Sequence, residues 1–394
     1  MTPANTMLRQ RGHSDSAKVG MVELFFDLVF VFAVTQLSHT LLADLSVANA
    51  VRVALLLLAV WWVWICTSWV TNWLDPERIP VRTCLFVLML AGLLLSASIP
   101  EAFAGRGLVF AGAYVCMQVG RSLFFLWAVR AAPVRMRRNF QRILAWQLLS
   151  GVLWIGAGFI DGETRLGWWA LALLLDLGSP WIYFWIPGLG RSTTADWDVE
   201  GGHLAERCAL FIIIALGESL LVTGATFAEL PWNGETLVAF VSAVLGSILM
   251  WWIYFDTGAE RAHLRIKHSD DPGRQARSAY TYLHVLIVAG IIVCAVADEV
   301  VLAHPQRGSH AVLAVILGGP ACYLAGTALF KWITNDRKAP PLSHLVGLSL
   351  LVVSAWLAFQ SQLTPLILGV LTTAVLAVVA VWESLAVRRT PRKT

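Results

Sequence analysis

The chain has 394 residues, of which 58% are hydrophobic and 14% are charged, and its formal net charge is +4. An average soluble domain contains roughly 25% charged residues, so this chain has too few charges to cover its apolar surface in water. The composition argues against a soluble enzyme, a disordered protein and a secreted disulfide scaffold, and it predicts a protein that lies in a lipid bilayer.

Twelve apolar runs are long enough to be transmembrane helices, because a bilayer core of about 30 Å requires roughly 20 apolar residues. The first run follows a short basic leader and has no cleavage site behind it, so we expect it to remain attached as a helix. The runs are continuous and do not alternate, which favours helices over the strands of a barrel. In chain order they cover residues 21–42, 49–71, 82–99, 107–130, 143–160, 167–187, 205–224, 236–255, 279–301, 311–332, 343–360 and 364–386.

The distribution of positive charge supports this count. With the N-terminus in the cytoplasm, 23 of the 29 Lys and Arg residues fall in cytoplasmic segments and 4 fall in outer loops. Cytoplasmic loops of membrane proteins carry such an excess of Lys and Arg. We therefore expect an all-α protein with about twelve transmembrane helices and both termini in the cytoplasm.

The third and ninth runs align with a shift of 198 residues, which places Leu85–Gly92 over Leu283–Gly290. The second and eighth runs also agree, with Trp-Trp-Val-Trp at residues 61–64 over Trp-Trp-Ile-Tyr at 251–254. This predicts a parallel repeat of six helices, and repeats of this kind place function at the interface between the halves. The expected divisions are a cytoplasmic segment (1–20), two six-helix repeats (21–190 and 191–387) and a basic cytoplasmic tail (388–394).

Two segments carry a family resemblance. Residues 22–33 read Val-Glu-Leu-Phe-Phe-Asp-Leu-Val-Phe-Val-Phe-Ala, and residues 203–220 contain His-Leu-Ala-Glu-Arg followed by Ala-Leu-Gly-Glu-Ser-Leu. Together they resemble the low temperature requirement A (LtrA) family of bacterial membrane proteins, over nearly the whole chain. The resemblance implies the bacterial cytoplasmic (inner) membrane and, from the cold-growth phenotype that names the family, a role in stress response.

A more distant resemblance concerns residues 23–37, which are similar to the first helix of the endosomal/lysosomal potassium channels with a Phe-Ser-Asp motif. Phe25 and Asp27 keep the outer letters of that motif, and Phe26 stands in place of the serine. In the second half Leu210 stands where the aspartate would be. The resemblance implies a channel-like protein, and the missing aspartate is a departure from the channel pattern.

Ionisable residues inside the runs are the candidates for function, because a charge at the bilayer centre costs about 2.5–3.5 kcal/mol on insertion scales. Glu23 and Asp27 are four residues apart and share one helix face, so they form either a cation or proton site or a structural pair with an arginine. Glu218, next to Ser219, lies about 18 Å beyond Glu206 along a helix and therefore past mid-bilayer.

Arg121 lies near the middle of the fourth run and stays protonated, so it needs a carboxylate or an anionic ligand. The acids available to it are Asp27, Asp176 and Glu218, and Pro180 predicts a kink in the helix that carries Asp176. The candidate permeation or intramembrane polar site consists of Glu23, Asp27, Arg121, Asp176, Glu206, Glu218 and Ser219.

Three further acids, Glu101, Asp298 and Glu299, lie at the outer ends of the third and ninth runs at matching repeat positions. They form either an external acidic mouth or merely polar helix ends. The six cysteines stand singly and form no metal-ligand spacing, so we expect no metal and no cofactor.

The chain has no nucleotide-binding, zinc-protease or serine-hydrolase motif in a suitable context, so we expect no enzyme and no nucleic-acid partner. The first hypothesis is a channel-like or secondary-transport protein for a cation, a proton or a small solute. The alternative is a non-transporting stress-adaptation protein that binds lipid or a partner, since basic cytoplasmic loops suit anionic headgroups. The bilayer is the expected partner, and the hypotheses include a small cation or solute and a homo-oligomer.

Overall fold

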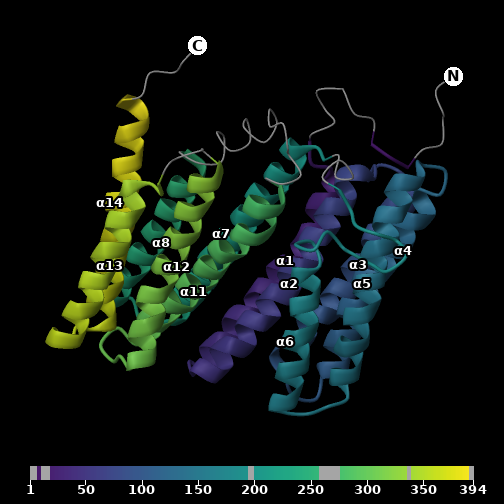
Figure 1. Cartoon of the computed structure of the whole chain (residues 1–394). Coiled ribbons are helices and arrows are strands. Elements are labelled where there is room, and N and C mark those ends of the chain that lie inside the picture. Colours follow the sequence, from purple (N-terminus) through teal and green to yellow (C-terminus); the bar gives the residue numbers. More distant parts are fainter. Residues whose placement is uncertain (1–6, 10–17, 194–198, 257–275, 335–338, 390–394) are drawn as a thin grey trace. The chain divides into compact units, whose positions relative to one another are not determined.

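The computed structural model describes residues 7–9, 18–193, 199–256, 276–334 and 339–389 (Figure 1). Parts of the expected cytoplasmic segment and basic tail, residues 1–6, 10–17 and 390–394, lie outside the described residues. The described residues contain no β-strand, only two isolated bridges. Their α-helices are α1 (Met21–Ala43), α2 (Val47–Trp73), α3 (Ile79–Ser98), α4 (Gly107–Ala128), α5 (Val134–Gly158), α6 (Glu163–Gly178), α7 (Gly201–Glu229), α8 (Gly234–Tyr254), α11 (His284–Ala303), α12 (His310–Thr334), α13 (Leu342–Ser361) and α14 (Pro365–Arg389).

Ten of the helices in the described residues are long and apolar enough to cross a membrane. The other two are α5 and α6. The first turns of α5 carry four arginines, and α6 has 16 residues, or about 24 Å of helix against a bilayer core of about 30 Å. The protein is therefore a multi-pass membrane protein whose described residues are helical. Of the twelve spans expected from the sequence, ten correspond to described helices that are long and apolar enough to cross a membrane.

The largest departures from the expected boundaries occur in these same two helices. Helix α5 begins at Val134, nine residues before the fifth apolar run, so part of the expected loop is helical. Helix α6 ends at Gly178, well before residue 187. Pro180 therefore does not kink the helix; it follows the helix end, and Tyr183 and Phe184 adopt positive φ angles in the turn beyond it.

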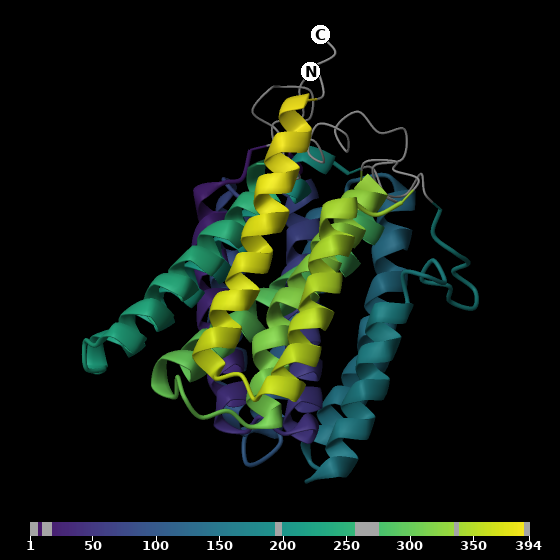
Figure 2. The ribbon, with the colours of Figure 1, turned by 90° about the vertical axis from the view of Figure 1, so that its left-hand side faces the viewer.

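The chain divides into two compact units. Unit 1 contains α1 to Thr40, helices α2–α6 and the first two turns of α7, up to Arg207. Unit 2 contains the rest of α7, together with α8 and α11–α14. Figure 2 shows α13 and α14 of unit 2 running side by side. The internal repeat stays a prediction.

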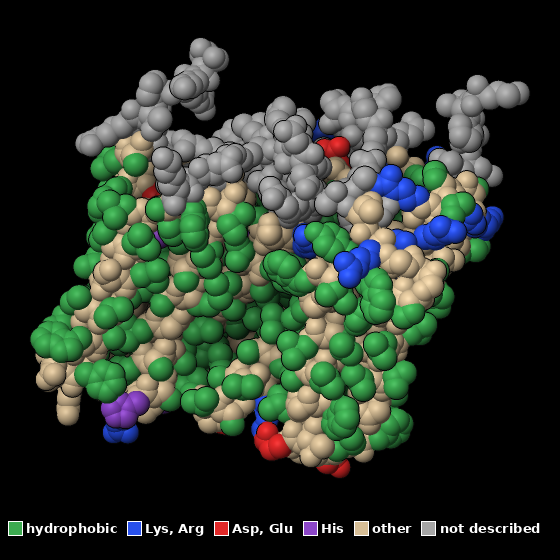
Figure 3. All heavy atoms as spheres, in the orientation of Figure 1, with side chains coloured by type: hydrophobic (Ala, Val, Ile, Leu, Met, Phe, Trp, Pro, Cys, Tyr) green, Lys and Arg blue, Asp and Glu red, His purple; other side chains and the backbone are tan. Residues whose placement is uncertain are grey.

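Each unit exposes apolar side chains along its helices and buries a small number of charged side chains. Large apolar residues such as Leu90, Val152, Leu221 and Phe359 are exposed, and Figure 3 shows the flanks of the helices in green. The blue Lys and Arg spheres of unit 1 gather at the end where α4 leads into α5. This is the arrangement expected for helices that face lipid, because water is absent there to solvate charges.

Glycines allow the closest helix contact in unit 2, between α11 and α12. A Cβ atom added to Gly290 would lie 2.5 Å from the backbone nitrogen of Tyr323, and one added to Gly319 would lie 2.7 Å from that of Cys294. Small residues at such positions let two backbones approach each other. The pair α11–α12 therefore forms a closely packed element within unit 2.

A test of this packing is Gly290→Ala, with Gly318→Ala as the control because a Cβ on Gly318 meets nothing within 4 Å. We expect Gly290→Ala to lower the melting temperature of the purified protein in detergent, by an overpacking cost of about 1–3 kcal/mol. Gly318→Ala should melt as the parent does. Equal melting of the two variants would contradict the close contact.

Candidate functional site

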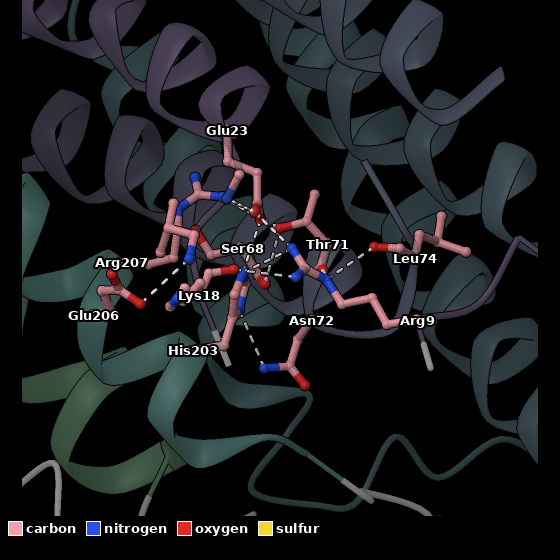
Figure 4. Close-up of polar contacts among 12 residues, drawn as sticks. Arg9, Lys18, Glu23, Ser68, Thr71, Asn72, Leu74, His203, Glu206 and Arg207 are labelled. Carbon is pink, nitrogen blue, oxygen red and sulfur yellow. Dashed lines mark hydrogen bonds and ion pairs between the residues drawn. The ribbon is translucent and has the colours of Figure 1, made fainter. Parts of the chain in front are cut away.

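A buried cluster of charged residues in unit 1 is centred on Glu23, in the first turn of α1 (Figure 4). One carboxylate oxygen, Oε2, accepts hydrogen bonds from Arg9 Nη2 at 2.6 Å and from the backbone nitrogen of Gly20 at 2.8 Å. The other, Oε1, accepts one from Arg207 Nη1 at 3.0 Å and lies 2.9 Å from His203 Nε2. Protein groups therefore surround both oxygens of Glu23.

Asp27 lies one turn further along α1 and shares the arginine with Glu23. Its Oδ1 accepts hydrogen bonds from Arg207 Nη2 at 2.5 Å and from Trp64 Nε1 at 2.7 Å. The guanidinium of Arg207 also lies over the Trp64 ring, 5.6 Å from its centroid, which is a cation–π geometry. The other carboxylate oxygen of Asp27, Oδ2, is buried and has no hydrogen-bond partner within the described residues. Asp27 thus has one carboxylate oxygen left for a proton or a cation.

Helix α7 contributes His203 and Arg207 to the cluster. These two residues are four apart in the sequence, so they lie on one face of the helix, as Glu23 and Asp27 do on α1. The start of α7 is fixed to α2 by a reciprocal pair of bonds between Asn72 and the backbone of Glu200, at 2.8 and 2.9 Å. These bonds place both α7 residues against the acids.

The N-terminal segment closes the cluster from another side. Arg9 donates from Nε to the carbonyl of Thr71 at 2.8 Å, and Leu8 forms an isolated bridge with Leu74. Glu206, a sequence candidate, accepts from the backbone nitrogen of Val19 at 3.2 Å. This segment therefore contributes a second arginine to the cluster.

Formal charge within the cluster balances. Two carboxylates, Glu23 and Asp27, face two guanidinium groups, Arg9 and Arg207, while His203 is the remaining ionisable member. Buried ion pairs of this kind persist only when each charge has close partners. His203 is buried, and its Nε2 lies between Glu23 Oε1 at 2.9 Å and Arg9 Nη2 at 3.2 Å. The open oxygen of Asp27 is thus the position in the cluster that has room for a proton.

A second polar network in unit 1 surrounds Asp176 of α6. Asp176 accepts hydrogen bonds from Ser150 Oγ at 2.6 Å, from Tyr114 Oη at 2.7 Å and from Trp154 Nε1 at 3.2 Å. All three donors are neutral, and no cation pairs with this carboxylate in the described part of the chain. Asp176 is therefore held by hydrogen bonds alone.

The sequence predicts an acid beside Arg121, but within the described residues Arg121 forms no ion pair with one. It donates to the side chain of Gln118, to Thr67 Oγ1 at 3.0 Å and to the carbonyl of Val63 at 3.2 Å. Gln118 in turn donates to Tyr114 Oη at 3.3 Å, which links Arg121 to Asp176 through two neutral side chains. Neutral oxygens accept from both terminal nitrogens of Arg121, while its buried Nε has no hydrogen-bond partner within the described residues, and Arg207 takes the place beside Asp27.

The remaining candidates belong to neither of the two networks described above as far as their hydrogen bonds and ion pairs are shown. Glu218 and Ser219 are buried in the part of α7 that belongs to unit 2. Glu101 ends the short 3-10 turn after α3 and pairs with Arg106 at 3.3 Å on the surface of unit 1. Asp298 and Glu299 are part-buried in α11 of unit 2. A common external mouth of these three acids stays a prediction.

One buried charge pair was missed by the sequence reasoning. Lys331 of α12 pairs with Glu383 of α14, and it also donates to the carbonyl of Ile253 at 2.8 Å. Ser343 donates to Glu383 at 3.2 Å, and His344 lies 3.4 Å from the same carboxylate. Glu383 falls inside the twelfth apolar run, so the cost of burying its charge was the signal that could have identified it.

Comparison with protein families matches residues 18–381 to the family described as Bacterial low temperature requirement A protein (LtrA). The chain belongs to the LtrA family. A relative in Rhizobium meliloti (strain 1021), Uncharacterized protein RA0937, is 42% identical over 395 residues, which cover 100% of this chain and 95% of the relative. No solved structure matches the chain. In this LtrA protein the two segments that carry the resemblance, at residues 22–33 and 203–207, are the ones that meet in the cluster of Figure 4.

The cluster is tested by Arg207→Gln, which leaves two buried carboxylates with less positive charge. We expect a loss of stability of about 3–5 kcal/mol, the range for breaking one side of a buried ion pair. The matched control is Arg106→Gln, because its pair with Glu101 is about half exposed and worth at most about 1 kcal/mol. Thermal unfolding in detergent measures both, and similar melting of the two variants would contradict a buried, charge-compensated cluster.

Proposed function

We propose that this LtrA protein moves a proton or a small cation across the membrane, as a channel-like or secondary-transport protein. The observation that carries the proposal is the Glu23–Arg207–Asp27 cluster, with one open oxygen on Asp27. Ionisable residues inside membrane helices are costly and commonly mark ion or proton pathways. Here they also come from the two segments that are typical of the family.

The geometry suggests competition as the mechanism. Arg207 binds both acids through different nitrogens, Nη1 to Glu23 and Nη2 to Asp27. A proton or cation that reaches Asp27 weakens its hold on Nη2, and Arg207 then relies on Glu23. Loss of that proton or cation restores the bridge. Such an exchange links occupancy of Asp27 to the contact between α1 and α7.

The polar residues on α2 extend this site toward a second acid. Trp64 donates to Asp27, and Thr67, three residues later on the same helix, accepts from Arg121. From Arg121 the hydrogen bonds continue through Gln118 and Tyr114 to Asp176. This series of polar groups inside unit 1 is consistent with passage of a small charged species. The driving energy would come from an ion gradient.

A second candidate function is a non-transporting stress-adaptation protein that binds lipid. The observation in its favour is the set of exposed arginines where α4 leads into α5, among them Arg130, Arg135 and Arg138. Basic groups next to a membrane attract anionic headgroups, at about 1 kcal/mol for each Lys or Arg. Under this function the buried acids would serve stability alone.

Flux measurements separate the two functions. The purified protein is placed in liposomes that contain a pH-sensitive dye for protons or a thallium-sensitive dye for potassium-like cations. We expect Asp27→Asn to reduce the flux at least tenfold, because the amide accepts no proton and carries no negative charge. Asp44→Asn is the control, since Asp44 is an exposed carboxylate in the turn after α1, where it accepts hydrogen bonds from Ser46.

His203→Gln is a second variant that keeps a side chain able to bond to Glu23 but removes the titratable ring. It should lower proton flux while thermal unfolding remains close to that of the parent. If the parent moves neither protons nor thallium, or if Asp27→Asn leaves an active parent unchanged, the proposal fails. Cold tolerance that survives both substitutions would support the lipid-binding alternative.

A further inference from the structure

A small cavity lies inside unit 2, enclosed by helices α8, α11, α12 and α14. Its volume is about 30 Å³. A cavity needs about 10–15 Å³ on this measure to hold one water molecule, so this one accepts one or two small species and excludes an organic solute. Its polar lining residues are Asp298, Thr372 and Thr373.

Among the residues that line the cavity Asp298 is the one acid, and this part-buried residue differs from the buried acids of unit 1. In the described part of the chain no hydrogen-bond donor and no cation contacts its carboxylate. Glu23, Asp27 and Asp176 all accept hydrogen bonds from protein groups. A carboxylate that is partly buried among apolar helices and has no compensating partner is costly, so this position favours either a proton or a bound cation.

Helix α12 contributes an unusual backbone acceptor to the same place. Pro320 lies inside this helix and has no N–H, so the carbonyl oxygen of Ile316 cannot receive its usual hydrogen bond from residue 320. Both Pro320 and Ile316 line the cavity. The proline therefore leaves the carbonyl oxygen of a residue that lines the cavity without its helical hydrogen bond, and a carbonyl oxygen is a hard ligand of the kind that Na⁺, Mg²⁺ and Ca²⁺ prefer.

The two threonines of α14 add hydroxyl oxygens. Thr372 donates its hydrogen to the carbonyl of Gly369 at 2.9 Å, which leaves the lone pairs of its oxygen free to face a cation. Thr373 exchanges hydrogen bonds with Ser242 of α8, at 3.0 Å to its hydroxyl and 3.3 Å to its carbonyl. These bonds fix the orientation of both hydroxyls.

The number of charges and the surroundings decide which cation fits. One carboxylate balances one positive charge, whereas divalent ions are generally bound through more acids together with water. An apolar cluster that includes Phe227, Leu302 and Leu368 packs in the same unit and shares Ala297, Val301 and Ile316 with the cavity wall. The site therefore has one negative charge, neutral oxygen ligands, little space and an apolar border.

We propose that the Asp298 cavity binds a single small monovalent cation of the size of Na⁺. Asp298 supplies the charge, Thr372 and the carbonyl of Ile316 supply neutral oxygens, and Pro320 keeps that carbonyl available. The site belongs wholly to unit 2 and does not include the residues of the Glu23 cluster. The proposed function leaves the transported ion open between a proton and a small cation, and this site would identify it as a cation of the size of Na⁺. The physiological role of the site rests on that proposed function.

The test is the melting temperature of the full-length protein in detergent, titrated with NaCl at constant ionic strength against choline chloride. We expect a saturable rise for the parent, and a smaller rise with KCl because K⁺ is larger than the cavity favours. Asp298→Asn should abolish the rise with NaCl. Thr372→Val, which keeps the shape and removes the hydroxyl, should raise the half-saturating NaCl concentration at least fivefold.

Glu299→Gln is the matched control, because it removes the same charge from the next residue of α11, which does not line the cavity. It should respond to NaCl as the parent does. If Asp298→Asn does not fold in choline chloride, the Thr372→Val titration decides. The proposal is overturned if Na⁺, K⁺ and choline act alike, or if the parent responds to pH but not to Na⁺, which would indicate a proton alone.

This experiment separates the site from the proposed function. A sodium response that Asp298→Asn removes, together with an absence of flux in liposomes, would keep the binding site and reject transport. Flux that depends on Asp27, without any response of the melting temperature to sodium, would support transport and reject the sodium site.

Discussion

The bridge that Arg207 forms between Glu23 and Asp27 is the interaction on which the arrangement of unit 1 depends. The arginine and the two acids are 180 and 184 residues apart in the sequence, and none of the three is tolerable alone in an apolar interior. Their burial therefore requires α1 and the start of α7 to lie together. Arg9 and Asn72 add to the constraint, because they fix the N-terminal segment and the start of α7 against α2. The apolar contacts of the helices are less specific, since lipid solvates such side chains about as well as a neighbouring helix does.

Much of the fold was predictable because one physical quantity, the length of apolar sequence, controls membrane helices. In the part of the chain that the structure describes, ten helices satisfy that criterion and lie where the apolar runs place them. The prediction was least accurate at α5 and α6, and the reason is local. Helix α5 continues through Arg135–Arg142, where helix propensity is high but hydropathy is low. Helix α6 stops at Gly178, and the apolar residues that follow it form a turn with Tyr183 and Phe184 at positive φ, which hydropathy does not detect.

The candidate site was predictable in its members more than in its pairing. The cost of a charge in the bilayer identified Glu23, Asp27, Arg121 and Asp176, all of which are buried. It did not indicate that Arg121 would donate to Gln118, Thr67 and a backbone carbonyl, because the number of neutral acceptors near a helix depends on packing. The spacing of His203 and Arg207 matches that of the two acids on α1, and this is a signal that a comparison of helix faces could have used. Lys331 escaped notice because it lies at the end of an apolar run, where a long side chain usually reaches the interface.

The buried acids differ in how completely the protein compensates their charge, and this difference assigns them different roles. Glu23 has donors on both oxygens, so it anchors the cluster. Asp27 has donors on one oxygen only, so a proton or cation can compete for it without dismantling all its contacts. Asp176 is held by three neutral donors, which stabilise a negative charge without cancelling it. Asp298 has no hydrogen-bond donor among the described residues and lines a cavity with hydroxyl groups, so an ion that binds there need displace no hydrogen bond of its carboxylate. Because affinity for an added cation rises as internal compensation falls, Asp298 is the position for stable binding, and Asp27 is the position where binding changes a contact between helices.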